Sequence, residues 1–350
     1  MMKNTTPIGT TRVKSKDLNA YEKNKTGWKL SKTQFVEVAH IAKMFKAHCN
    51  FKLLIDTKNP EFLKGQVSKE GAIQGARINQ LPNGKVLSKA YSLFAKNLVV
   101  HDESSHDHWD ALYENPGGGH SHLYTLDKVK NSTKEKYKTV EDFSKRYALL
   151  EKKVTIALGD RADNLCLPMY TLLKTYMRVG NETYYKMNGH AGLTTLKKKD
   201  LMIKGNNVIF TYISKKGVPM TIKQEFPSVY VSRLKKGING LKNNDFIFSD
   251  IHGKPLRDTE FMGAFERYCG KRFYPHIVRS YYATQKAKEF LKRKRHATKE
   301  EVKELYMGIA EKLGHKKFDK KNNEWKNDYN VTIHYYLRPE LVEKINEIVK

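Results

Sequence analysis

The sequence predicts an α+β fold in two domains: a small N-terminal mixed α/β domain with antiparallel strands, and a mainly α-helical C-terminal domain with a small β-sheet or hairpin. Three observations support this prediction. The chain has 350 residues, more than one domain usually holds. Short strand-like runs separated by turn signals fill its first part. Longer stretches with the apolar spacing of helices fill the rest.

The first 130 residues are expected to hold an arm and a domain. Residues 1–28 are polar, rich in lysine and without periodicity, so they predict a flexible basic arm. Residues 29–130 predict the N-terminal domain, which begins with a helix over Lys32–Lys46. Its strand candidates are Phe51–Ile55, Val86–Phe94 and His122–Leu126, with turn signals at Pro82-Asn83-Gly84 and Pro116-Gly117-Gly118-Gly119.

Residues 131–350 predict the second domain. Two β-rich runs flank the turn Lys215-Lys216-Gly217, which is typical of a hairpin over Val208–Ile222. A further strand is expected at Asp245–Phe248. Helices are expected at Glu141–Leu158, from Pro168 to the region of Arg178, and at Asp258–Arg272, His276–Leu291 and Glu300–Leu313. The end, Thr332–Val349, is expected to be helical, with Pro339-Glu340 placed as a helix start.

The charge of the chain indicates a polyanionic partner. The 65 Lys and Arg residues exceed the 37 Asp and Glu residues, which gives a formal net charge of +28. Because the excess runs along the whole chain, large parts of the folded surface must be positive. Nucleic acid, and double-stranded DNA in particular, is therefore the expected partner.

Several other classes of protein are disfavoured. No apolar run is long enough to span a bilayer, and the N-terminus lacks the apolar stretch of a secretory signal. Cys49, Cys166 and Cys269 lie far apart, which argues against a disulfide framework and a structural zinc site. We expect a protein that works in the cytoplasm or at the nucleoid, with a virus-infected cell or a virion as the alternative.

Six residues of the C-terminal half could together cleave a phosphodiester: Arg178, Lys215, His276, Arg279, His315 and Tyr336. The phenol of Tyr336 can attack phosphorus, and nearby cations would favour its phenolate form. Two arginines offer planar forks that match phosphate oxygens. His315 could donate a further hydrogen bond to a nonbridging oxygen, and Lys215, on a hairpin, suits the general acid for the leaving 5′ oxygen.

These residues lie in motifs that resemble the type IB DNA topoisomerases, over roughly residues 140–350. Met177–Glu182 followed by Ala191–Leu196 is similar to that family's Arg-x-Gly turn and the Gly-Leu-x-Thr-Leu strand that follows it. The Val208–Ile222 hairpin resembles the family's lysine-bearing hairpin. His276-Ile277-Val278-Arg279 and Leu313-Gly314-His315 match two boxes of the wider tyrosine recombinase and topoisomerase IB superfamily.

The segment Tyr335–Leu341 resembles the nucleophile segment of the small bacterial and poxvirus enzymes, and this alignment selects Tyr336 with Tyr335 as the nearby rival. Two features depart from that pattern. His276 stands where the small topoisomerases usually have lysine, as it does in site-specific recombinases, so its role could be catalytic or structural. The hydrophilic insert Phe318–Asn330 lengthens the stretch between His315 and Tyr336 and is expected to form a surface loop.

The resemblance implies an enzyme that relaxes supercoiled DNA through a 3′-phosphotyrosyl intermediate and then religates the strand, without ATP or metal. It also implies a monomer that clamps the duplex with its two domains. A tyrosine recombinase with the same chemistry is the first alternative. A DNA-binding protein without enzymatic activity is the alternative of another class.

The remaining motifs favour no cofactor. Five histidines of the N-terminal domain are more typical of strands and loops than of a metal site: His101, His106, His108, His120 and His122. Gly117-Gly118-Gly119-His120 lacks the Gly-Lys-Ser/Thr ending of a phosphate-binding loop, so ATP binding is not indicated.

Overall fold

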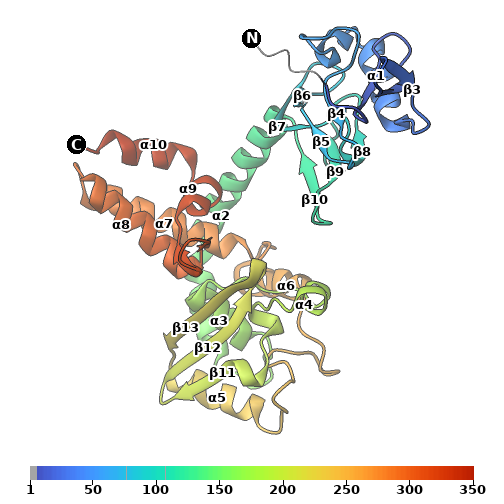
Figure 1. Ribbon diagram of the computed structural model, residues 1–350. Coiled ribbons are helices and arrows are strands. Elements are labelled where there is room, and N and C mark those ends of the chain that lie inside the picture. The colour runs from blue at the N-terminus through green and yellow to red at the C-terminus, as the bar shows by residue number, and fades with distance from the viewer. Residues whose placement is uncertain (1–5, 76, 107) are drawn as a thin grey trace. The chain divides into compact units, whose positions relative to one another are not determined.

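The structure is a computed structural model that describes residues 6–75, 77–106 and 108–350. The chain divides into two compact units, Met1–Glu135 and Lys136–Lys350, and passes from one to the other within helix α2 (Leu126–Ala157). The sequence predicted this boundary between residues 130 and 131. The mixed α and β composition, with antiparallel strands in the first unit and mainly helices in the second, confirms the predicted fold class (Figure 1).

The first unit is built from small antiparallel sheets. Its five-stranded sheet has the order β3-β2-β1-β4-β5, formed by Trp28–Leu30, Ala20–Lys23, Thr11–Val13, Gln66–Val67 and Ile73–Gln74. The hairpin of β6 (Ile78–Gln80) with β7 (Val86–Tyr91) and the sheet β10-β9-β8 (His120–Leu123, Ala111–Glu114, Lys96–Val100) follow. Helix α1 (Val36–Ala47) buries Val38, Ile41 and Phe45 in the core of this unit.

Two sequence predictions for this unit were wrong. Residues 1–28 were expected to form a flexible arm, but β1, β2 and part of β3 lie in this stretch and pair in register, with Val13 opposite Ala20; residues 1–5 lie outside the described part. These strands are too short for a visible alternating pattern, and the burial of Val13 and Ala20 is what fixes them. Phe51–Ile55 was expected to be a strand, but Phe51–Leu54 forms the 3-10 helix η1.

The second unit packs helices around one three-stranded antiparallel sheet. The sheet consists of β11 (Leu201–Lys204), β12 (Asn207–Ser214) and β13 (Val218–Glu225). Apolar residues of β12 share a core with helices α3 (Cys166–Thr175) and α5 (Ser228–Ile238), which lie beside the sheet in Figure 1. The β12–β13 pairing confirms the predicted hairpin, and its tip is the short 3-10 turn η4 (Lys215–Gly217).

The remaining helices form a second core at the carboxyl end. This part contains α4 (Glu182–Asn188), α6 (Asp258–Cys269), α7 (Ile277–Arg293), α8 (Lys299–Leu313), α9 (Asn330–Tyr336) and α10 (Pro339–Glu347), with 3-10 turns η2 (Leu193–Thr195) and η3 (Lys198–Asp200) between α4 and β11. Residues of α7, α8, α9 and α10 pack together around Ile309 and Ile345, and Figure 1 shows these helices side by side. Pro339 opens α10, as the sequence predicted.

The segment between α8 and α9 is not an irregular loop. It forms a second hairpin of β14 (Lys316–Asp319) and β15 (Glu324–Asn327), in which Phe318 pairs with Trp325. Trp325 packs against the main core of this unit, which explains why a hydrophilic stretch adopts ordered strands. Among the described residues, none of the helices combines the length and the apolar run that crossing a bilayer requires.

Candidate active site

Arg178 lies in a tight turn that follows α3. Tyr176 ends that helix in the left-handed conformation, with φ of 56°. The backbone carbonyl of Arg178 then accepts a hydrogen bond of 2.8 Å from the amide of Leu193, and that of Val179 accepts one of 2.7 Å from Thr194. The Gly-Leu-Thr-Thr-Leu segment therefore holds the arginine turn through its backbone. It does so as a 3-10 turn at Leu193–Thr195, although the resemblance implied a strand.

Two glycines allow this close approach. Gly180 has φ of +103°, which side chains rarely adopt. A Cβ atom added to Gly192 would lie 2.7 Å from the carbonyl oxygen of Arg178 and 2.7 Å from Cα of Gly180. Any side chain at position 192 would thus push the arginine turn away from its support.

Lys215 lies at the tip of the β12–β13 hairpin. Lys216 takes the left-handed conformation there, which closes the turn and leaves the Lys215 side chain exposed. The Nζ atom of Lys215 lies 6.0 Å from the ring centroid of Tyr184. Together with Arg178 and His276, Lys215 lines a cavity of about 440 Å³ in the second unit. Residues more than 90 positions apart in the sequence thus share one hollow.

Arg279, in the first turn of α7, is only 2% exposed. Its guanidinium donates to the carbonyl oxygens of Tyr176, at 2.5 Å, and Leu313, at 2.7 Å. It also lies 3.1 Å from Nε2 of His315. Its Nε atom is buried without a hydrogen-bond partner. A buried cation held by neutral acceptors, with a donor to spare, is suited to receive an anion.

Tyr336 ends α9 and is 4% exposed. The guanidinium carbon of Arg279 lies 5.3 Å from its ring centroid. The rings of His315 and His276 lie 4.6 Å and 5.3 Å from it, centroid to centroid. Tyr335, the rival suggested by the sequence, is 62% exposed. The structure therefore places Tyr336, and not Tyr335, beside the arginine and the histidines.

Positive charge acts on the phenol of Tyr336. Burial by itself raises the pKa of this phenol, but the charges of Arg279, Arg178 and Lys136 outweigh burial, and the pKa lies below its ordinary value of 10.0. Most buried tyrosines of this chain show the opposite: burial raises the pKa of Tyr212 to about 12. A lowered phenol pKa is what a nucleophilic tyrosine requires.

Both histidines of the site are neutral near pH 7. Burial, followed by the charges of Arg279 and Arg178, lowers the pKa of His276 to about 3, and the same causes lower that of His315 to about 3. Nδ1 of His315 lies 2.8 Å from the hydroxyl of Thr332. Each histidine can therefore donate or accept a hydrogen bond here but adds no charge.

The structure brings all six predicted residues together. Arg178, Lys215 and His276 share the cavity, while His276, Arg279 and His315 surround Tyr336. The insert does not separate His315 from the nucleophile, because the amide of Asp328 returns to the carbonyl oxygen of His315 at 2.9 Å. The β14–β15 hairpin projects between two points of the chain that lie close together.

Sequence reasoning missed two neighbours of this site. Thr332 lies one helical turn before Tyr336, a spacing that places both side chains on one face of α9 and could have been recognised. Lys136 lies 200 positions before Tyr336, yet its Nζ atom is 5.7 Å from the Tyr336 ring centroid. No local motif marks a lysine whose role depends on such a distant partner.

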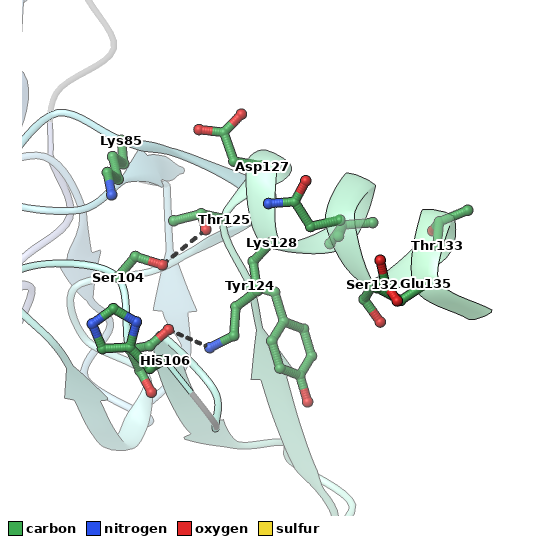
Figure 2. Close-up of a pocket in the computed structure, with 13 residues that line it drawn as sticks. Lys85, Ser104, His106, Tyr124, Thr125, Asp127, Lys128, Ser132, Thr133 and Glu135 are labelled. Atoms are coloured by element: carbon green, nitrogen blue, oxygen red, sulfur yellow. Dashed lines mark hydrogen bonds between the residues drawn. The ribbon is translucent and has the colours of Figure 1, made fainter. Parts of the chain in front are cut away.

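A second cavity, of about 720 Å³, lies in the first unit (Figure 2). Its lining mixes charges, with Lys85 and Lys128 against Asp127 and Glu135. The ammonium of Lys128 is already engaged by the carbonyl of Ser105, at 2.9 Å, and by the buried carboxylate of Asp110, at 3.3 Å. This cavity is therefore a poorer anion site than the one around Arg178.

Two of the N-terminal histidines pack against each other, and two others lie on a strand. The rings of His101 and His108 stack edge to face at 4.9 Å, and both contact Trp109. Strand β10 carries His120 and His122. Within the part of the chain that the structure describes, no group of three or more His, Cys, Asp or Glu side chains is arranged to hold a metal ion.

Comparison with known proteins assigns a family to most of this second unit. The model of the family described as eukaryotic DNA topoisomerase I, catalytic core, matches residues 127–335. This segment contains five of the six site residues and ends one position before Tyr336. No curated protein matches the chain.

Two solved structures show partial likeness. One is the XerH site-specific recombinase bound to difH substrate, a pre-cleavage complex, with 18% identity and a TM-score of 0.33 over 49% of this chain and 50% of that chain. The other is XerH bound to palindromic difH substrate, a post-cleavage complex, with 17% identity and a TM-score of 0.34 over 57% of this chain and 51% of that chain. The chain thus spans about half the length of these structures.

Proposed function

The chain belongs to the family of the eukaryotic DNA topoisomerase I catalytic core, and from this premise we propose that it is a type IB DNA topoisomerase that relaxes supercoiled DNA. The observation that carries the proposal is the buried Tyr336 phenol, with Arg279 5.3 Å from its ring centroid and a pKa below the ordinary value. An activated phenol among guanidinium groups is equipped to attack a phosphodiester.

In the proposed reaction, the phenol of Tyr336 first releases its proton to solvent. Its oxygen then forms a bond to phosphorus, and the bond from phosphorus to the 5′ oxygen breaks. The product is a 3′-phosphotyrosyl enzyme, and the leaving 5′ oxygen takes a proton from Lys215, which is exposed at the hairpin tip. After the duplex has rotated, the 5′ hydroxyl attacks the phosphotyrosine and returns its proton to Lys215. The bond from phosphorus to the oxygen of Tyr336 breaks, and Tyr336 leaves as the phenolate. The ester conserves the energy of the broken bond, so this cycle uses neither ATP nor a metal ion.

The other residues of the site serve the phosphate. Arg178 and Arg279 stabilise the charge on the nonbridging oxygens. His315 keeps Arg279 in place through the contact of 3.1 Å. His276 lines the cavity of about 440 Å³ as a neutral group and donates a hydrogen bond to the same phosphate.

The partner of this site is double-stranded DNA. Because the chain has a net charge of +28, contacts to phosphate dominate its affinity for DNA. Binding therefore weakens steeply as the salt concentration rises. We propose that a single copy acts on the duplex, with both units of the chain contacting it.

A tyrosine recombinase is the second candidate, and His276 favours it. The sequence resemblance associates a histidine at this position with recombinases, and its ring lies 5.3 Å from that of Tyr336. The two functions differ in outcome. Relaxation of a supercoiled plasmid in EDTA by the protein alone supports the topoisomerase, whereas strand exchange only between paired sites supports the recombinase.

Capture of the covalent intermediate tests the chemistry common to both candidates. The full chain is incubated with a duplex that carries a nick just downstream of the cleavage position. The short fragment with the free 5′ hydroxyl then dissociates after cleavage, so religation fails. We expect a denaturant-resistant adduct with wild-type protein and with Tyr335→Phe, and none with Tyr336→Phe. Tyr336→Phe should still bind DNA. An adduct on another residue, or equal adduct with both variants, contradicts the proposal.

A further inference from the structure

Lys136 approaches the nucleophile from a helix distant in sequence. It lies in α2, and its ammonium donates a hydrogen bond to the backbone carbonyl oxygen of Tyr335. The same nitrogen lies 5.7 Å from the ring centroid of Tyr336 and 5.1 Å from that of Tyr137. One lysine thus contacts both the backbone before the nucleophile and the nucleophile's ring.

Neighbouring contacts fix this arrangement. The hydroxyl of Tyr137 donates to the carbonyl oxygen of Leu337, and Arg338 forms an ion pair with Glu141. Helix α2 therefore forms hydrogen bonds or ion pairs with the residues immediately before and immediately after Tyr336. The distance from Lys136 to the phenol is set by three contacts and does not depend on one flexible side chain.

The surroundings make Lys136 an unusual lysine. It is half-buried, and the groups that face Tyr336 with it are cationic or neutral: Arg279 from α7, His276 just before α7, Arg178 from the turn after α3, and His315 just after α8. Burial lowers the pKa of Lys136, and the charge of the Tyr336 phenol acts in the opposite direction. A lysine is seldom buried beside arginines unless an anion offsets the cost.

We propose that Lys136 is a positioning residue for Tyr336, which holds the backbone of the nucleophile through Tyr335 and stabilises the phenolate that forms when the phenol loses its proton. This inference rests on the proposed function, since the phenolate matters only if Tyr336 attacks DNA. The anion that Lys136 stabilises is the phenolate, whereas the two arginines act on both the phenolate and the phosphate. Removal of Lys136 therefore weakens activation of the nucleophile more than DNA binding.

Single-turnover cleavage of the nicked duplex, measured from pH 6 to 10, tests the inference. The variants are Lys136→Gln, which loses the charge, and Lys136→Arg, which keeps it. Lys145→Ala, an exposed lysine of the same helix, is the matched control. We expect Lys136→Gln to cleave about tenfold more slowly at neutral pH, with the loss recovered at high pH, where the phenol ionises without help from Lys136. Lys136→Arg should recover most of the rate, and Lys145→Ala should match wild type.

A second measurement reads the phenol directly. With 3-fluorotyrosine placed at position 336, fluorine NMR follows ionisation of this one ring without any DNA. We expect the titration midpoint to move to higher pH in Lys136→Gln and to stay unchanged in Lys145→Ala. Circular dichroism of each variant checks that the fold is kept.

The outcomes separate the two proposals. If wild type forms the adduct on Tyr336 but Lys136→Gln shows the same rate, the same pH profile and the same fluorine titration, the inference about Lys136 is overturned and the function stands. A Lys136→Gln rate that is reduced equally at every pH, with an unmoved titration, also overturns it, because a merely structural loss behaves so. If wild type forms no adduct, the proposed function fails and the inference falls with it.

Discussion

Nε2 of His315 lies 3.1 Å from Nη2 of Arg279, and the direction of this hydrogen bond fixes the state of the histidine. An arginine carries only donors, so Nε2 must accept. The proton of the neutral ring then resides on Nδ1, which donates to the hydroxyl of Thr332 at 2.8 Å. The sequence suggested that His315 donates to a phosphate oxygen. In this arrangement His315 instead orients Arg279, and donation from Nε2 requires the proton to change nitrogens.

Removal of the Thr332 hydroxyl should slow cleavage although Thr332 itself is not proposed to contact DNA. Thr332→Val keeps the shape of this fully buried side chain but leaves Nδ1–H without an acceptor, at a cost of about 1–3 kcal/mol in folding free energy. Because His315 and Arg279 then lose their fixed orientation, we expect cleavage to slow about tenfold. Urea unfolding measures the loss of stability and single-turnover cleavage the loss of rate, while filter binding checks that DNA affinity is unchanged. Thr332→Ser, which keeps the hydroxyl, should cleave at nearly the wild-type rate; equal rates for Val and wild type would rule out this role.

The glycine beneath the arginine turn should tolerate no side chain. In Gly192→Ala, the new Cβ would lie 2.7 Å from the carbonyl oxygen of Arg178, so the turn must shift. We expect a loss of about 2 kcal/mol or more in unfolding free energy and a larger loss of cleavage than of DNA binding. Urea unfolding and the cleavage assay provide the measurements. Gly237→Ala is the control, because it lies within helix α5, where a Cβ meets nothing within 4 Å.

Acid should destabilise the fold through the two buried histidines. Burial and the nearby arginines lower the pKa of both His276 and His315 from 6.5 to about 3. Between these values the unfolded chain binds more protons than the folded chain, so stability falls as pH drops below about 6.5. Each histidine lowers the free energy of unfolding by at most about 1.4 kcal/mol per pH unit in this range. Urea unfolding between pH 7.5 and 5 tests this, and His315→Gln should give a shallower dependence than wild type. If the free energy of unfolding changed with pH equally in both proteins, the lowered pKa of His315 would be refuted.

The same pKa values make a kinetic prediction. Because both histidines stay neutral above about pH 4, the cleavage rate should show no inflection near pH 6.5, where an ordinary histidine titrates. The rate should instead rise with pH as the Tyr336 phenol ionises. Rates measured at constant ionic strength make the comparison, since salt alone changes DNA binding. A step near pH 6.5 that disappears in His276→Asn would show that this histidine is protonated during turnover.

Local sequence patterns were enough to predict several elements of the second unit. The β12–β13 hairpin forms as expected because two β-rich runs flank a glycine turn, and α10 begins at Pro339, whose fixed φ suits a first helical position. The order of motifs also selected the six site residues. These features could be read because each depends on residues close together in the chain.

Tertiary contacts decided the rest. Strands β1 and β2 in the supposed arm exist because Val13 and Ala20 are buried by partners elsewhere in the first unit, and the insert is ordered because Trp325 reaches the core of the second. The motif favoured Tyr336 over Tyr335, and burial, at 4% against 62% exposure, distinguishes the two side chains in the fold. Lys136 contacts its tyrosine across 200 residues. A sequence pattern reports which side chains a helix or strand can present, but burial and electrostatic environment arise from groups that only the folded chain brings together.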